Sequence, residues 1–191
     1  MEKKLFIFDV GGVLLLNHHA LHNFAAMVNI PYDVLKADYK PYDADLMMGK
    51  KDVEEYYNHV HEKFSLPLGR DYYYEAFKPY RNEFILSWVK KLKENGHPVV
   101  IGSNTYGPFF KVMREYLEEE FSLFDSLYFS HQIHLMKPNS DFFEYILKKE
   151  GFQAKDAVFT DDLKENTEGS IKTGLTALTY DENDNEAADK F

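Results

Sequence analysis

One stretch near the start of the chain limits the possible folds more than any other. Leu5 to Phe8 are four consecutive apolar residues, and they run directly into Asp9. Their β-branched and aromatic content is typical of a strand that is buried on both faces. Burying a carboxylate inside such a strand would cost several kcal/mol unless it were paired. We therefore expect Asp9 at the carboxyl end of the strand, where ligands bind in open α/β sheets.

Two glycines follow Asp9 and predict a tight turn. Gly11 and Gly12 permit backbone angles and close approaches that a Cβ atom would forbid. A carboxylate at a strand tip beside such a turn is typical of a nucleophile or a metal ligand, and a structural Asp that caps the loop is the common alternative. A secretory signal is a third interpretation, because Lys3 and Lys4 precede the apolar run. We reject it, since Asp9 interrupts the run and no small-x-small cleavage site follows.

Composition narrows the class of protein. The chain has 191 residues, of which 45% are hydrophobic, so it can hold a core domain with an inserted subdomain. The net charge of −10 argues against nucleic acid as a partner, because phosphate backbones select basic surfaces. The absence of cysteine excludes disulfides and thiolate chemistry. No apolar run is long enough to span a bilayer, so we expect a cytoplasmic protein without a membrane partner.

Helical periodicity without a convincing strand extends over residues 16–81. Pro31 is expected to open a helix that Pro41 breaks, and Asp52 is expected to cap a helix that runs through Phe64. From residue 82 onward, helices and strands alternate. The later strands are predicted at residues 98–101, 127–130, 157–160 and 175–178.

This alternation predicts a parallel, doubly wound α/β sheet. The core would comprise residues 1–15 and 82–191. Residues 16–81 would form an inserted α-helical cap of the kind that a lid requires. The acidic tail that begins at Asp181 is expected to fray.

Polar residues follow the predicted strands at the ends that a parallel sheet brings to one edge. They are Asp9, Ser103, Asn104, Asp161 and Asp162, joined by Lys137 in a loop. Carboxylate oxygens suit a hard cation, and Mg²⁺ takes one or two protein carboxylates together with substrate phosphate. A lysine and a hydroxyl would hold the remaining phosphate oxygens.

The order of these motifs resembles that of the haloacid-dehalogenase-like hydrolases, most of which are Mg²⁺-dependent phosphatases that work through an aspartyl-phosphate. The family's first motif, an apolar strand followed by Asp-x-Asp-Gly-Thr/Val, is similar to residues 8–13. Its second motif matches Ser103 at a strand end, and its third matches Lys137, which precedes a proline. Its fourth motif, an acidic pair, matches Asp161 and Asp162. The resemblance covers nearly the whole chain and implies a Rossmann-like core with a helical cap.

The resemblance also implies roles for the motif residues. Asp9 would be the nucleophile and a metal ligand, and the Gly11 carbonyl would be a second ligand. Asp162, together with Asp161, would complete the Mg²⁺ site, which Asn166 would support. The groups expected to bind the phosphoryl group are Ser103, Asn104, Gly11, Gly12 and Lys137. This is covalent catalysis by a carboxylate, with the cation and the lysine stabilising charge in the transition state.

Gly11 departs from the pattern of most phosphatases in the family, which place an acid/base Asp there. The subgroup whose first motif is Asp-x-Gly-Asn/Gly-Val fits best, and it includes phosphatases of sugar phosphates. We therefore expect a small phosphorylated metabolite as substrate, such as a sugar 1-phosphate, because an anomeric hydroxyl leaves with less need of a proton than an ordinary alcohol does. His134, or one of the cap histidines His18, His19 and His22, could instead supply the proton.

Other interpretations remain open. A binding protein or sensor could keep the phosphate site and lose turnover through Gly11. A receiver-type phosphoacceptor also uses Asp, Lys and Ser/Thr at strand ends, but the long helical insertion counts against it. His18 and His22 lie one helical turn apart, yet no third ligand has the spacing of a dedicated metal site. The oligomeric state is not indicated by the sequence.

Overall fold

Five parallel strands form the central sheet of the computed structural model, which describes residues 3–183. The strand order is β5-β4-β1-β6-β7, and each neighbouring pair is parallel. The strands are β1 (Leu5–Phe8), β4 (Val99–Ser103), β5 (Ser126–Phe129), β6 (Ala157–Asp161) and β7 (Thr176–Thr179). The doubly wound α/β prediction is therefore confirmed, and each later strand lies within two residues of its predicted ends.

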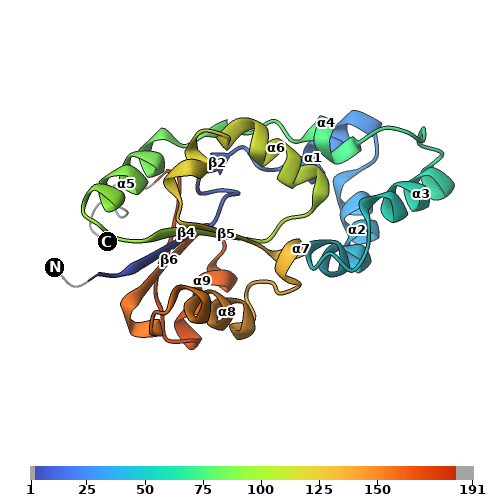
Figure 1. Cartoon of the computed structure of the whole chain (residues 1–191). Helices are drawn as coiled ribbons and strands as arrows, with labels where there is room; N and C mark the ends of the chain where they lie inside the picture. The colour runs from blue at the N-terminus through green and yellow to red at the C-terminus, as the bar shows by residue number, and fades with distance from the viewer. Residues whose placement is uncertain (1–2, 184–191) are drawn as a thin grey trace.

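Helices cover both faces of this sheet (Figure 1). The main helices are α5 (Glu83–Glu94) and α6 (Gly107–Leu117) on one face, with α8 (Ser140–Glu150) and α9 (Lys164–Lys172) on the other. Shorter segments lie between them, namely α7 (Ser130–Ile133), η1 (Glu120–Leu123) and η2 (Ala154–Asp156). Because side chains alternate along β1, Phe8 packs in one apolar cluster with Ile85, and Ile7 packs in a second with Phe142.

Four helices lie within residues 16–81, between β1 and α5 in the chain. They are α1 (Ala20–Val28), α2 (Tyr32–Met47), α3 (Val53–Phe64) and α4 (Tyr72–Ala76). Aromatic side chains hold them together. The ring of Tyr73 on α4 lies 5.2 Å from the ring of Phe24 on α1 and 5.6 Å from that of Tyr39 on α2, measured between centroids. Edge-on pairs of this kind stabilise a core beyond the area that they bury.

A short antiparallel ribbon joins these helices to the sheet. β2 (Leu15–Leu16) pairs with β3 (Tyr80–Arg81), and the side-chain amide of Asn82 donates a 2.8 Å hydrogen bond to the Val13 carbonyl. The prediction that residues 16–81 contain no strand is therefore wrong at both ends. Strands of two residues are too short to show an alternating pattern. These two pair only because the segments that lead into and out of the four helices lie side by side in the fold. The division into core and cap at these segments remains our proposal.

Helix α2 continues through Pro41, where we predicted a break. Proline removes one helical hydrogen bond and is tolerated where the freed carbonyl can reach solvent. Pro41 lies on the exposed side of α2, whereas Leu35, Tyr39 and Leu46 on the same helix are buried. Burial of this apolar face outweighs the local preference of one residue, since most helical stability in proteins comes from packing.

Other predicted helix ends agree with the structure. Asp52 caps α3 in a capping box with Glu55, and Gly151 ends α8 in the left-handed conformation with φ of 74°. The predicted fraying of the tail after Asp181 falls largely on residues 184–191, which lie outside the described residues.

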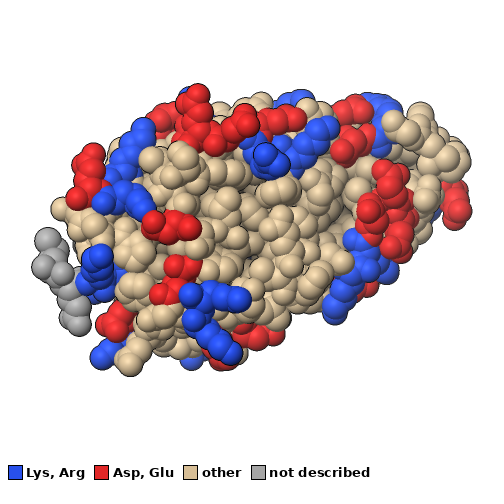
Figure 2. All heavy atoms as spheres, viewed as in Figure 1, with Lys and Arg blue, Asp and Glu red and all other residues tan. Residues whose placement is uncertain are grey.

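The surface carries charges of both signs. On the face shown in Figure 2, lysine and arginine side chains alternate with aspartate and glutamate around an uncharged centre. Within residues 3–183, no helix is long and apolar enough to cross a membrane.

Candidate active site

The ends of the parallel strands bring the predicted polar residues to one edge of the sheet. Ser103 ends β4, Asp161 ends β6, and Asp9 directly follows β1. The strand register places these ends side by side. Asp162 comes next after β6, and Lys137 enters from the loop after α7. This is the edge at which open α/β sheets bind their ligands.

Lys137 is held between two carboxylates. Its Nζ atom lies 2.9 Å from Oδ1 of Asp9 and 2.6 Å from Oδ2 of Asp161. The lysine side chain has no exposed surface. Burial alone would lower the pKa of Lys137, but the ion pairs with Asp161 and Asp9 outweigh burial and raise the pKa. The ammonium group therefore stays charged beside Asp9, as a buried cation with close partners does.

The two neighbouring aspartates differ in what they can still bind. Asp161 is fully buried, and its oxygens accept hydrogen bonds from the Leu163 amide at 2.8 Å and from the Asn166 side chain at 3.0 Å, in addition to the ion pair with Lys137. The side chain of Asp162 is 20% exposed and lines a cavity. Asp162 is therefore open to a ligand, whereas Asp161 is already surrounded by donors from the protein.

The acidic cluster fits a divalent cation. Carboxylate oxygens of Asp9, Asp161 and Asp162 all lie within 4.8 Å of one another. With Lys137 charged, three carboxylates would leave two uncompensated negative charges in a buried place. Burial raises the pKa of Asp9 to about 6 despite the nearby Lys137, and burial together with Asp161 raises the pKa of Asp162 to about 6. A hard cation with oxygen ligands would relieve this repulsion.

Gly11 and Gly12 differ in what a side chain at each position would contact. Gly12 has φ of 74°, and a Cβ atom there would lie 2.4 Å from Cγ of Asp162. Gly12 thus permits the close approach of Asp162, and it does not line the cavity above Asp9. Gly11 does line that cavity, and a Cβ atom there would lie 3.8 Å from the ring of His18. A side chain at position 11 would therefore point toward His18.

Ser103, which ends β4, and Asn104, which follows it, differ in their hydrogen bonds. The Ser103 hydroxyl is buried and has no hydrogen-bond partner within the described part of the chain, although Ser103 does not line the cavity. The Asn104 side chain accepts a hydrogen bond from the Lys137 amide and donates one to the Lys137 carbonyl, both at 3.0 Å. Asn104 therefore fixes the loop that carries the lysine, a function that the sequence alone did not indicate.

Helix α9 supports the same loop. A Cβ atom on Gly169 would lie 2.3 Å from the Pro138 carbonyl oxygen, so only glycine allows this contact. The signal in the sequence is a glycine inside a helix, which costs about 1 kcal/mol relative to alanine and so suggests a packing reason. Asn166 lies on the same helix and donates a hydrogen bond to Asp161, while its expected support of a metal site stays a prediction.

The predicted histidines separate into two groups. His18, His19 and His22 line the cavity, and Nε2 of His18 lies 3.5 Å from Oδ2 of Asp162. Burial and the neighbouring His19 lower the pKa of His18. Nδ1 of His134 instead lies 2.8 Å from the Met48 carbonyl, and His134 does not line the cavity. Of the candidates for a proton donor, the histidines of the α1 region are therefore the ones near Asp9.

A cavity of about 420 Å³ opens above Asp9, within the usual size of small-molecule sites. Its floor includes Asp9, Lys137 and Asp162 from the strand ends. The helices of residues 16–81 contribute much of its wall, with side chains from α1, α2 and α4. A molecule bound there would contact both parts of the protein at once.

Comparison with protein-family models matches residues 3–169 to haloacid dehalogenase-like hydrolases. The chain belongs to this family. The prediction made from the four motifs is confirmed at this level, and the protein is an enzyme of the hydrolase class. Its membership of the subgroup with Gly at the third position of the first motif stays a prediction.

Relatives of this haloacid dehalogenase-like hydrolase include enzymes with named activities. The sesquiterpene phosphatase astK of Aspergillus oryzae is 24% identical over 183 residues, covering 92% of this chain and 88% of that protein. A predicted HAD-like hydrolase from Porphyromonas gingivalis has a TM-score of 0.80 at 22% identity, covering 100% of this chain and 98% of that one. The HAD family enzyme bt-2542 from Bacteroides thetaiotaomicron, solved with magnesium and inorganic phosphate, has a TM-score of 0.77 at 19% identity, covering 94% and 95%. At such identities the solved structures show the fold alone.

Proposed function

We propose that this protein is a Mg²⁺-dependent phosphatase of small phosphomonoesters. The proposal depends above all on Asp9, a carboxylate at the floor of a cavity, 2.9 Å from the ammonium group of Lys137. A carboxylate nucleophile, a fixed cationic group and a cluster of acidic oxygens are what phosphoryl transfer through a covalent intermediate requires. The family membership supports the same chemistry.

Two displacements at phosphorus would complete the reaction. The Asp9 carboxylate attacks phosphorus, the bond from phosphorus to the ester oxygen breaks, and the departing alkoxide takes a proton from solvent water. Water then attacks the phosphorus of the aspartyl-phosphate, which releases inorganic phosphate and restores the carboxylate. Lys137 and Ser103, whose hydroxyl has no hydrogen-bond partner among residues 3–183, would donate hydrogen bonds to the phosphoryl oxygens in both steps.

Mg²⁺ would be held by Asp9, Asp162 and the Gly11 carbonyl, the members of the predicted set that line the cavity. Asp161 would belong to the cluster mainly as the group that orients Lys137, since its oxygens already accept several hydrogen bonds. When bound, the cation would supply positive charge to the oxygens of the transferring phosphoryl group. Asn104 and Gly12 would be supporting residues. Asn104 would position Lys137, and Gly12 would permit the position of Asp162.

The leaving group should be one that departs easily. Gly11 lacks the carboxylate that most phosphatases of the family use to protonate the departing oxygen. A sugar 1-phosphate or an aryl phosphate suffers less from that loss than a phosphate of an ordinary alcohol, because its leaving oxygen is more acidic. A sugar 1-phosphate therefore remains a candidate substrate on grounds of acidity.

Two relatives support the proposal without defining the substrate. The relative astK is named a sesquiterpene phosphatase, and the bt-2542 structure contains magnesium and inorganic phosphate. The first name fits hydrolysis of a phosphate ester, and the second structure fits a protein that binds Mg²⁺ and phosphate. The cytoplasmic location and the absence of nucleic-acid and membrane partners stay predictions from composition.

Release of inorganic phosphate tests the proposal. The purified protein is assayed with a panel of phosphomonoesters in Mg²⁺, in a chelator, and in the chelator with Mg²⁺ added back. We expect turnover that needs the cation and returns with it. Tight binding of one or more of these phosphomonoesters without any release of inorganic phosphate would contradict the proposal and favour the sensor interpretation. Full activity in the chelator would contradict the metal site.

A further inference from the structure

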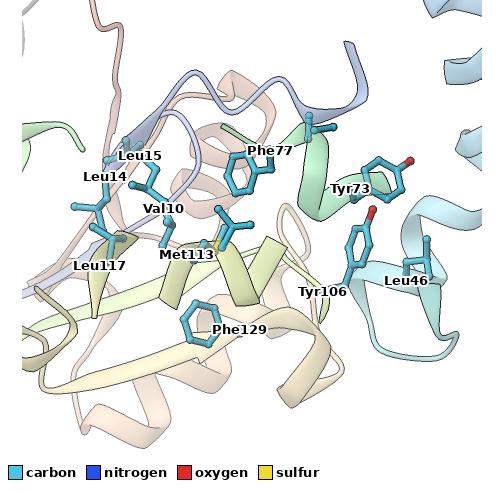
Figure 3. Close-up of a cluster of buried hydrophobic side chains, with 14 of the residues drawn as sticks. Val10, Leu14, Leu15, Leu46, Tyr73, Phe77, Tyr106, Met113, Leu117 and Phe129 are labelled. Carbon is cyan, nitrogen blue, oxygen red and sulfur yellow. The ribbon is translucent and has the colours of Figure 1, made fainter. Parts of the chain in front are cut away.

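The wall of the cavity above Asp9 contains a set of aromatic rings that the phosphatase chemistry does not use. The ring of Phe109 on α6 lies 5.3 Å from the ring of Phe77 and 5.3 Å from that of Tyr73, between centroids. All three residues line the cavity, together with Met113 of α6. Figure 3 shows Phe77 near Met113, and Tyr73 farther away next to Tyr106. This wall is therefore continuous and largely apolar.

Methionines add to the apolar lining from other elements. Met47 at the end of α2 and Met136 beside Lys137 line the cavity, as Met113 does. Three of the six methionines of the chain thus surround one cavity. Methionine is unbranched and flexible, so it adapts to apolar groups of irregular shape. Such a lining suits a hydrocarbon group better than a ring of hydroxyl groups.

Two polar side chains of the helical wall, His22 and Tyr39, already contact other aromatic residues. His22 stacks on Tyr32 with ring centroids 3.4 Å apart and planes 10° apart. The Tyr39 hydroxyl donates a 3.2 Å hydrogen bond to the Tyr106 hydroxyl. A sugar has several hydroxyl groups, and each one that is buried without a partner weakens binding. The Tyr39 proton is already donated to Tyr106 and is not available to such a hydroxyl group.

We infer that the organic group of the substrate is largely hydrocarbon, so that the substrate is the phosphate ester of an apolar alcohol or phenol. The inference rests on the proposed phosphatase function, and it adds a preference for apolarity to the preference for an acidic leaving oxygen. Of the two candidates with an acidic leaving oxygen, it favours an aryl phosphate over a sugar 1-phosphate. These are separate properties of a substrate. The aromatic and methionine wall selects the first, and Gly11 selects the second.

Two substrate pairs test these properties. Hexyl phosphate and glucose 6-phosphate both release an ordinary alcohol, so this pair isolates apolarity. Phenyl phosphate and glucose 1-phosphate both release a more acidic hydroxyl, but phenol is the stronger acid, so in this pair both properties favour the apolar member. We expect the apolar member of each pair to have the higher kcat/KM, by about tenfold or more, because several carbon atoms leave water for an apolar wall. Equal or lower kcat/KM for the apolar members of both pairs would overturn the inference.

A matched pair of variants tests the wall itself. Met47→Gln replaces a cavity-lining methionine with a polar side chain of similar length. Val34→Gln makes a comparable change on the same helix at a residue that is 47% exposed and does not line the cavity. Met47→Gln should lower the ratio of kcat/KM for hexyl phosphate over glucose 6-phosphate several-fold, and Val34→Gln should leave that ratio unchanged. An equal effect of both variants would contradict a role of the wall.

Binding is measured separately so that a failure of turnover does not hide the answer. Calorimetry on Asp9→Asn with Mg²⁺ compares hexyl phosphate with glucose 6-phosphate without hydrolysis. Tighter binding of hexyl phosphate supports the inference even if no substrate is turned over, in which case only the proposed function fails. Phosphate release without any apolar preference has the opposite meaning, because the function then stands and the substrate inference fails.

Discussion

The floor and the wall of the cavity are built on different principles. At the floor, charged groups from strand ends are buried and held in place by close partners, as Lys137 is between Asp9 and Asp161. At the wall, aromatic rings and methionines from helices offer shape and apolar surface. On our proposal, the strand ends supply the chemistry, which tolerates little displacement. The wall, to which both the helices of residues 16–81 and the core helix α6 contribute, supplies selection, which can vary. Changes at the floor and at the wall should therefore have effects of different size and kind.

The largest effect is expected from a change at the floor. Asp9→Asn removes the nucleophile and keeps the shape of the side chain, so kcat should fall by many powers of ten. Asp43→Asn makes the same chemical change on the wall, since Asp43 also lines the cavity. It should change kcat/KM by less than about tenfold, as a contact to the organic group would. Comparable losses in the two variants would contradict the separation of chemistry from selection.

The next effect concerns the proton that the leaving group needs. With Gly11 in place of a carboxylate, kcat/KM should rise steeply with the acidity of the leaving oxygen across a series of substituted phenyl phosphates. A positioned general acid is worth about two to four powers of ten in rate, which sets the size of the effect.

The two histidine sites provide the controls for this series. A Cβ atom at position 11 would lie 3.8 Å from His18, whereas His134 contacts the Met48 carbonyl outside the cavity. If neither is the acid, His18→Ala and His134→Ala keep the steep dependence. If kcat/KM of the wild type does not depend on the acidity of the leaving oxygen but becomes steeply dependent on it in His18→Ala, then His18 protonates the leaving group. The separation between floor and wall would then be incomplete.

A smaller effect is expected in the stability of the metal-free protein. The pKa values of Asp9 and Asp162 are raised to about 6 in the folded state from the ordinary value of 3.8. The folded state therefore binds more protons than the unfolded state between about pH 4 and pH 6, and the stability it gains at low pH is lost as the pH rises through about 6. Tm without Mg²⁺ should rise by several degrees on acidification from pH 8 to about pH 5.5.

Asp162→Asn and saturating Mg²⁺ are the controls for that measurement. The variant removes one of the two raised carboxyl groups, so at pH 8 without metal it should be more stable than the wild type by about 1–3 kcal/mol. Added Mg²⁺ should stabilise the wild type at pH 8 and should stabilise the variant much less. A wild-type Tm that is independent of both pH and Mg²⁺ would argue against an acidic metal site.

The smallest effect is expected at the two segments that connect residues 16–81 to the rest of the chain. We predict that residues 16–81 move as a lid, so that cleavage by a protease near the β2–β3 crossing should slow a few-fold with Mg²⁺ and fluoroberyllate, which mimics a bound phosphoryl group. The Met48 carbonyl already contacts His134 of the core, and Gly49 approaches the His131 carbonyl closely. Identical cleavage patterns with and without the mimic would count against a mobile lid.

The sequence alone was sufficient for the sheet and for the residues at its edge. Buried parallel strands are continuous apolar runs, and glycine, proline and capping residues mark their connections, so both signals are local. Asp9, Lys137 and Asp161 could likewise be placed together from their positions in the chain, because parallel strands end on one side of the sheet. The capping box at Asp52 is another local signal that the structure reproduces.

The tertiary structure decided what each polar group can still bind. Asp161 is surrounded by donors while Asp162 faces the cavity, and Asn104 is used to hold the Lys137 loop. Neither difference appears in a motif, because each depends on which neighbours come within hydrogen-bonding distance. The apolar wall is likewise made of single residues from separate helices, and α2 passes through Pro41 because its buried face outweighs one lost bond. Contacts between residues distant in the chain set these properties, and no local pattern encodes them.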